Sequence, residues 1–237
     1  MRSAMAVSGV PRHVFTVLQV LGTVAILVCV PSNAAKAAAL PCWWLLTFQK
    51  LQRSELFFYA VACAFFTVMD VLSVGHGIFA FEHPDVLGLP FYEPLLWGFY
   101  IVHTLRAVRG PAPRRSYLHA GVIAVLFSAA FSVISDAQVL LGVTSGLLLA
   151  GLILFHDRED IAYVAYMIFL GAVFEYSGVW SRQWSYTNPP LGGVPPWFIT
   201  LWGGVGLLVR RLALPAMADL IRWQQRKQAE PVVAASR

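Results

Sequence analysis

The amino-acid sequence predicts an all-α protein, a polytopic bundle of about eight transmembrane helices with both termini cytoplasmic. Of its 237 residues, 58% are hydrophobic and only 12% are charged, which is about half the charged share of a soluble globular domain. The apolar residues form long blocks, and a helix that crosses a bilayer needs about 20 predominantly apolar residues. This composition excludes a soluble globular domain and a disordered chain. It also excludes a nucleic-acid-binding protein, despite the net charge of +5.

Apolar runs between charged residues and Pro or Gly breaks define the candidate spans. The second span follows a tight turn at 31–33, and the fourth begins at Tyr92-Glu93-Pro94, where proline suits a first helical turn. Residues 1–213 are therefore expected to form a single transmembrane domain, and residues 214–237 a polar cytoplasmic tail. No internal repeat of useful strength is visible. The candidate spans are residues 14–30, 34–48, 56–78, 92–105, 117–134, 137–155, 161–179 and 196–209.

The distribution of basic residues predicts the orientation of these spans. An even number of spans places both termini on one side, and cytoplasmic loops carry an excess of Lys and Arg. With cytoplasmic termini, 15 of the 17 Lys and Arg residues fall on the inner side, and only Lys36 and Arg182 fall outside. This sorting is typical of a multi-pass protein of a bacterial inner membrane.

Three acidic residues fall within or at the ends of the candidate spans. Asp70 and Glu175 lie in the outer halves of their spans, and Glu93 begins another. An ionisable residue inside a span costs about 2.5–3.5 kcal/mol on insertion scales and is a functional-site hypothesis by default. We therefore expect Glu175, Asp70 and Glu93 to be catalytic residues that share one cavity. The structural alternative is a carboxyl that hydrogen-bonds a neighbouring helix for packing.

Aromatic and basic residues around the outer loops are the candidate substrate-binding groups. Trp180, Arg182, Trp184 and Tyr186 follow Glu175 closely, and the rigid Pro pairs nearby favour an ordered loop that caps a pocket. An interfacial aromatic belt is the simpler interpretation, since Trp and Tyr favour the headgroup level. His76, near the outer loop, and His103, within a span, complete this set of substrate-binding candidates.

A metal site is the alternative for the histidines. Imidazole and carboxylate groups suit zinc or iron, so His76, His83, His103 and Glu93 are alternative ligands. No HxxxH or HExxH spacing occurs in the sequence. The prediction is therefore that the protein uses no cofactor and no metal.

One stretch, residues 171–204, resembles integral-membrane carotenoid biosynthesis proteins of the hydratase type. In those proteins a G-x-x-x-E-x-x-G-V helix leads into an aromatic loop, and a G-V-P sequence then opens a helix that contains Trp. The matching residues here are Gly171, Glu175, Gly178, Val179, Tyr186, Gly193, Val194, Pro195 and Trp202.

The resemblance implies a membrane enzyme, a hydratase-type lyase acting on an isoprenoid or carotenoid-like membrane lipid. Glu175 would protonate an alkene, Asp70 or Glu93 would orient it or activate water, and aromatic faces would stabilise the cation. Two alternatives remain open. One is a metal-dependent lipid hydrolase or oxidase. The other is a non-catalytic membrane transporter or complex-assembly subunit.

Overall fold

The computed structural model describes residues 12–187 and 189–235. The ends of the predicted membrane domain and tail, residues 1–11 and 236–237, lie outside this part. The first half of the chain contains α1 (Arg12–Cys29), α2 (Asn33–Phe48), α3 (Arg53–Gly75), β1 (Phe79–Phe81) and α4 (Glu93–Ala107). The second half contains α5 (Tyr117–Val133), α6 (Ala137–Phe155), α7 (Arg158–Trp180), β2 (Trp184–Tyr186), α8 (Phe198–Leu208), the π-helix η1 (Val209–Ala213) and α9 (Leu214–Ala235).

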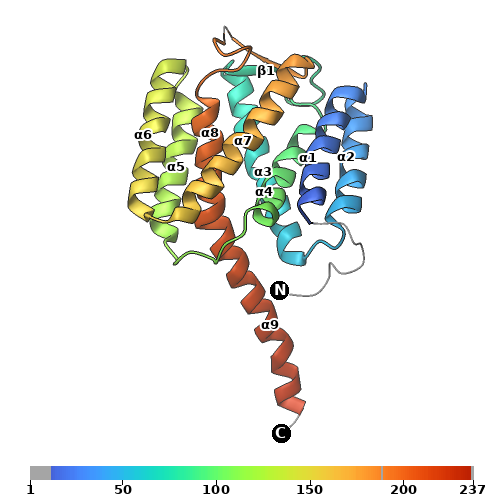
Figure 1. The fold of residues 1–237 in the computed structure, drawn as a ribbon, viewed down its shortest axis with the longest axis vertical. Helices are drawn as coiled ribbons and strands as arrows, with labels where there is room; N and C mark the ends of the chain where they lie inside the picture. The colour runs from blue at the N-terminus through green and yellow to red at the C-terminus, as the bar shows by residue number, and fades with distance from the viewer. Residues whose placement is uncertain (1–11, 188, 236–237) are drawn as a thin grey trace.

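The predicted all-α bundle is confirmed, and each predicted span coincides with a helix within a few residues. Three of these helices, α3, α6 and α7, are long and apolar enough to cross a membrane, while α1 and α5 are apolar but shorter. The number of spans and their orientation stay predictions. The predicted tail forms a helix, α9, that leaves the bundle (Figure 1).

The two halves of the bundle repeat the same order of elements, which the sequence alone did not reveal. Shifting the first half by 105 residues places α3 exactly on α7 and β1 exactly on β2, and places α4 on α8 followed by η1. The same shift places α1 on α5 and α2 on α6 within two residues. In Figure 1 the α1–α2 pair and the α5–α6 pair flank a central group made of α3, α4, α7 and α8. The chain is therefore built from two similar four-helix units.

The short sheet lies where the two units meet. β1 and β2 pair antiparallel, with Phe79 opposite Tyr186 and Phe81 opposite Trp184. The central pair joins Ala80 to Ser185, which occupy equivalent positions in the two units. Exchanging equivalent residues of the two units leaves the same strand pairs. A two-fold pseudo-symmetry axis therefore passes through the central pair. Both strands lie at the end of the bundle opposite α9, here called the strand end (Figure 1).

Each unit carries the same ion pair, with a buried carboxylate, at the opposite end, here called the basic end. Arg106 of α4 donates from Nε and Nη2 to the two carboxylate oxygens of Glu55, each at 2.6 Å. The equivalent Arg211 donates from Nε to Asp160 at 2.8 Å and from Nη2 to the other oxygen of that carboxylate. Two parallel bonds of this kind are the strong form of an Arg–carboxylate contact. The pairs fasten the last helix of each unit to its third.

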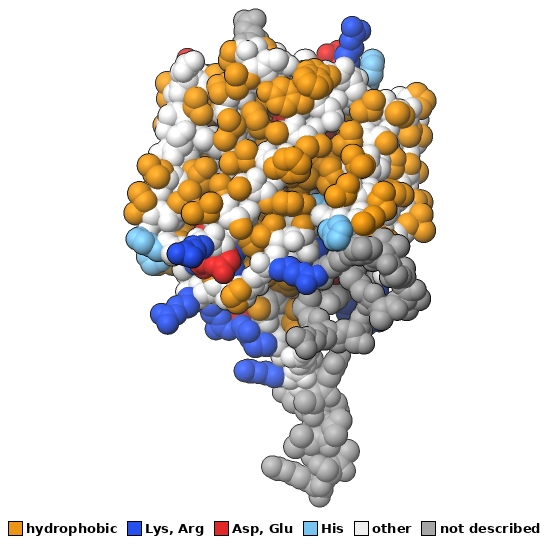
Figure 2. Space-filling model, in the orientation of Figure 1, with side chains coloured by type: hydrophobic (Ala, Val, Ile, Leu, Met, Phe, Trp, Pro, Cys, Tyr) orange, Lys and Arg blue, Asp and Glu red, His pale blue; other side chains and the backbone are white. Residues whose placement is uncertain are grey.

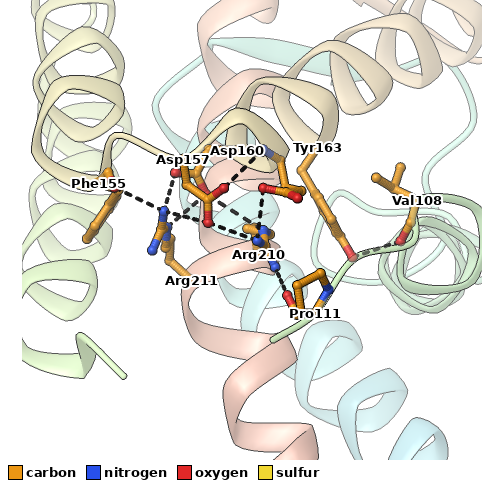
Figure 3. A network of polar contacts seen from close by, with 9 residues as sticks. Val108, Pro111, Phe155, Asp157, Asp160, Tyr163, Arg210 and Arg211 are labelled. Atoms are coloured by element: carbon orange, nitrogen blue, oxygen red, sulfur yellow. Dashed lines mark hydrogen bonds and ion pairs between the residues drawn. The ribbon is translucent and has the colours of Figure 1, made fainter. Parts of the chain in front are cut away.

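The second unit adds a further arginine to this network (Figure 3). Arg210, 1% exposed as a side chain, donates to the Asp157 carboxylate at 3.0 Å and to the backbone oxygen of Pro111. The π-helical turn carries both Arg210 and Arg211, and both are buried. Tyr163 donates to the Val108 carbonyl oxygen at 2.8 Å beside them. The network therefore ties the loop between the units to α7 and η1.

Side chains on the surface separate by type along the bundle (Figure 2). Hydrophobic side chains cover the middle of the face in view, and most Lys and Arg side chains gather near the basic end. The two residues predicted to lie outside, Lys36 and Arg182, belong to the strand end, where Lys36 donates to Gln183 next to Arg182. This separation is the pattern expected of a membrane-embedded bundle.

Candidate functional site

A chamber of about 440 Å³ lies between α3, α5 and α8 and extends toward the start of α9. Its wall is made mainly of apolar and aromatic side chains. Val61 and Phe65 of α3 belong to this wall and are each 47% exposed on the bundle surface. The chamber therefore reaches the apolar exterior beside α3. Pockets of this kind, apolar with a few polar groups, are the default binding-site hypothesis.

The three carboxyl residues predicted from the sequence line this one chamber, near the strand end. Of the three carboxyl groups, that of Glu175 on α7 accepts the most hydrogen bonds. Its oxygens accept hydrogen bonds from Trp184 Nε1 at 3.0 Å, Tyr186 Oη at 2.7 Å and Trp202 Nε1 at 3.0 Å. β2 supplies the first two donors and α8 the third. This arrangement explains how a carboxyl is held among apolar helices, because each oxygen has a donor.

Asp70 of α3 is the equivalent of Glu175 in the first unit. Its carboxylate accepts a hydrogen bond from Trp97 Nε1 at 2.8 Å, and Trp97 is itself the equivalent of Trp202. The two indole rings stack with centroids 5.3 Å apart across the pseudo-symmetry axis. An acid–tryptophan pair is thus present in both units, so part of the polar cluster is a feature of the fold.

Glu93 has no such counterpart. It is the first residue of α4 and is 8% exposed, and the equivalent residue in the second unit is Phe198. Its Oε2 atom is buried without a hydrogen-bond partner. Glu93 lines the same chamber as Asp70 and Glu175. It is therefore an acidic group that the repeated scaffold does not require.

Within the described residues, larger side chains occupy the space that is equivalent to the chamber. This counterpart under the pseudo-symmetry lies between α7, α1 and α4. His103 closes that space by bonding Gln19 Oε1 through Nδ1 at 2.9 Å and Tyr166 Oη through Nε2 at 2.6 Å. Small or apolar residues stand at the matching chamber positions. The pairs of equivalent residues, chamber first, are Val61 and Tyr166, Ala124 and Gln19, Gly204 and Phe99, and Leu208 and His103.

The predicted substrate-binding residues divide into two groups. Trp184 and Tyr186 line the chamber. The others do not: Trp180 is 72% exposed and donates to the Gly192 carbonyl oxygen at 3.2 Å, and His103 belongs to the filled space. His76 is exposed and its Nδ1 contacts the Leu72 carbonyl oxygen. Arg182 sits in a left-handed turn (φ 57°) of the predicted ordered loop and is not part of the wall.

The alternative metal ligands do not come together. His83 is exposed on the outer loop, while His103 is fully buried between Gln19 and Tyr166. Within the described residues, no group of three or more His, Cys, Asp or Glu is arranged to hold a metal ion.

Sequence reasoning missed the aromatic residues that complete the site. Trp97, Tyr100, Trp197 and Phe66 all line the chamber. Phe66 stacks on Trp97 with centroids 3.9 Å apart. The missing signal is the shift of 105 residues, which aligns Trp97 with Trp202 and Asp70 with Glu175.

Close packing at two glycines sets the position of the tryptophans that donate to Glu175. A Cβ atom on Gly178 would lie 2.0 Å from Trp184 Cζ2, and one on Gly171 would lie 2.2 Å from Trp202 Cγ. Real Cβ atoms do not approach so closely, so these helix positions require glycine.

We expect Gly178→Ala to displace Trp184 from Glu175 and to cost about 1–3 kcal/mol, the usual cost of overpacking. Thermal unfolding in detergent, followed by tryptophan fluorescence, measures the loss. Gly146→Ala on α6 is the control, because nothing lies within 4 Å of its new Cβ. A Gly178→Ala protein as stable as the control would contradict the packing argument.

No family model and no curated protein matches this chain. Among solved structures, it is similar to the crystal structure of MvINS, a mycobacterial Insig homologue from Mycobacterium vanbaalenii, with a TM-score of 0.59 and 19% identity over 69% of this chain and 96% of that chain. It is also similar to a cross-linked MvINS trimer, with a TM-score of 0.62 and 18% identity over 71% of this chain and 97% of that chain. At this identity, the likeness shows the fold alone.

These similarities correct the resemblance to carotenoid hydratases, which is wrong. The solved structures that share this fold are of an Insig homologue, and this finding overturns alkene hydration with Glu175 as the acid as the main function. The structure gives the physical reason. Gly171 and Gly178 make room for tryptophans, and Gly193 occupies a left-handed turn (φ 99°). The matching residues are those that build the fold, and therefore they carry little information about a reaction.

Proposed function

We propose that this chain is a non-catalytic membrane protein that binds an apolar, lipid-class ligand in the chamber beside α3. The observation that carries the proposal is the difference between the two units. The pseudo-symmetric counterpart of the chamber is filled by a hydrogen-bonded chain through His103. The chamber itself is left open by smaller residues such as Gly204 and Ala124. Larger side chains fill the equivalent space in the other unit, so the fold does not require a cavity. A ligand that occupies the chamber explains why it is kept open.

The route into the chamber supports a ligand from the bilayer. Val61 and Phe65 connect the chamber wall to the exposed apolar surface of α3. A water-insoluble molecule would enter there laterally, with its apolar body along α3 and α5 and its polar end at the carboxyl groups. The aromatic wall supplies contact area at low conformational cost.

A transporter is the second candidate, and the internal repeat favours it. Many transporters consist of two repeats with the binding site at the repeat interface. Here, however, the described chamber is open on one side of the pseudo-symmetry axis and its counterpart is filled. Alternating access through two equivalent routes would need a second open route, which the filled counterpart does not provide. Flux of the ligand across proteoliposomes would favour transport over simple binding.

The experiment is to fill the chamber by copying the other unit. We expect Val61→Tyr, which copies Tyr166, to weaken binding of oleyl alcohol about tenfold or more, because the phenol ring occupies the entrance. Isothermal titration calorimetry in non-ionic detergent measures the affinity, and mass spectrometry checks that the alcohol is recovered unaltered.

Val68→Tyr is the matched control. Val68 lies on the same helix and is 60% exposed but does not belong to the chamber wall. We expect the control to bind as the natural chain does. Equal binding by both variants would contradict the chamber as the site, and recovery of a chemically altered alcohol would contradict a non-catalytic role.

A further inference from the structure

The polar end of the chamber is acidic. Asp70, Glu93 and Glu175 contribute three carboxyl groups to the wall, and no Lys, Arg or His belongs to it among the described residues. A buried carboxyl is neutral unless a cation or hydrogen-bond donors stabilise its charged form. The wall supplies no cation, so a ligand that brings one would stabilise the charged form of these acids.

Two buried basic side chains near the ends of the bundle have partners away from the chamber. Lys36, at the strand end, donates to Gln183. Arg211 pairs with Asp160 at the basic end. Neither belongs to the chamber wall, so a ligand is the source of positive charge that fits the described chamber.

The three acids differ in how well the protein satisfies them. Glu175 accepts three hydrogen bonds and Asp70 accepts one from Trp97. Glu93 Oε2 accepts none, although Glu93 is 92% buried and lines the chamber. A buried acceptor without a donor is costly. Since Phe198 occupies the equivalent position in the other unit, the fold can form without this acid.

Aromatic rings surround the same region. The rings of Tyr100, Trp184 and Tyr186 line the chamber with the acids. Aromatic faces attract organic cations, and this attraction grows when the cation is desolvated. Acids and aromatic faces together are suited to an ammonium group.

We propose that the ligand of this chamber carries a single protonated amine at the end of its apolar body, and that Glu93 accepts the ammonium N–H. This inference rests on the proposed binding function and names its ligand class. A phosphoethanolamine head would bring a negative phosphate toward three acids, so a head with net positive charge fits the chamber better. An alcohol could donate to Glu93 but brings no positive charge to the three acids.

The test compares two probes with the same chain, N,N-dimethyloleylamine and oleyl alcohol, by calorimetry in non-ionic detergent. We expect the natural chain to bind the amine about tenfold or more tighter than the alcohol. Glu93→Gln should remove this preference, because the affinity for the amine falls by more than the affinity for the alcohol. Glu93→Phe, which copies Phe198, should do the same and provides a second variant if the first does not fold.

Glu82→Gln is the control, since Glu82 is an exposed acid of the outer loop outside the chamber wall. We expect it to keep the preference for the amine. Equal affinity of the natural chain for the two probes, or an unchanged preference in Glu93→Gln, would overturn the ammonium proposal and leave lipid binding standing. Failure of both probes to bind would instead overturn the proposed function.

Discussion

Arg211→Ala is expected to lower the free energy of unfolding by about 3–5 kcal/mol, the usual cost of removing one partner of a buried ion pair. Asp160 is fully buried, and in the variant its carboxylate would lose the two hydrogen-bond donors that Arg211 supplies. The Arg211 guanidinium also lies 4.5 Å from the centroid of the Phe155 ring, a contact that alanine would lose. The fall in the thermal unfolding midpoint in detergent measures the effect.

Two comparisons make this result specific. Arg115→Ala removes an exposed ion pair with Asp219, in which the arginine side chain is 61% exposed, and such pairs contribute about 0–1 kcal/mol. Arg211→Lys keeps the charge but cannot form two parallel bonds, so we expect an intermediate loss. A loss for Arg211→Ala no larger than that for Arg115→Ala would contradict a fastening role for the basic-end pair.

Glu175→Ala is expected to cost roughly 3–5 kcal/mol, because it leaves two buried indole donors and one half-buried phenol donor without their acceptor. The donors are Trp184, Tyr186 and Trp202, which come from β2 and α8. We therefore expect a lower unfolding midpoint together with a changed tryptophan emission, since two indoles lose their hydrogen bonds. Thermal unfolding and fluorescence spectra in detergent measure both changes.

Asp70→Ala is the natural comparison for Glu175→Ala. Asp70 occupies the equivalent position but accepts only the bond from Trp97, so its loss should cost about 1–3 kcal/mol. Glu175→Gln retains one acceptor oxygen and should cost less than Glu175→Ala. If the two alanine variants were equally stable, the three hydrogen bonds to Glu175 would not be what holds β2 against the bundle.

Comparison of the two units separates what the fold requires from what distinguishes the site. The acid–tryptophan pairs and the Arg–carboxylate pairs occur in both units, so they belong to the scaffold. The chamber results from positions where the units differ, above all Gly204 in place of Phe99. Glu93 in place of Phe198 gives its polar end. Function is therefore to be sought in the asymmetric positions.

The repeat itself escaped detection in the sequence for a physical reason. Packing within an apolar bundle accepts many combinations of Leu, Val, Ile, Phe and Ala, so equivalent helix positions have diverged freely. The residues kept in both units are few and widely spaced. Examples are the acids Asp70 and Glu175 and the tryptophans Trp97 and Trp202.

The sequence by itself determined the helical bundle, the approximate bounds of its helices and the three acids of interest, because long apolar blocks and rare charges depend only on local composition. It did not determine which side chains meet. Only the tertiary structure placed Glu93 beside Asp70 and Glu175, closed one interface with His103 and opened the other as a chamber. Those outcomes depend on contacts between residues far apart along the chain. Such contacts leave no periodic pattern in the neighbouring sequence, so they cannot be read from it.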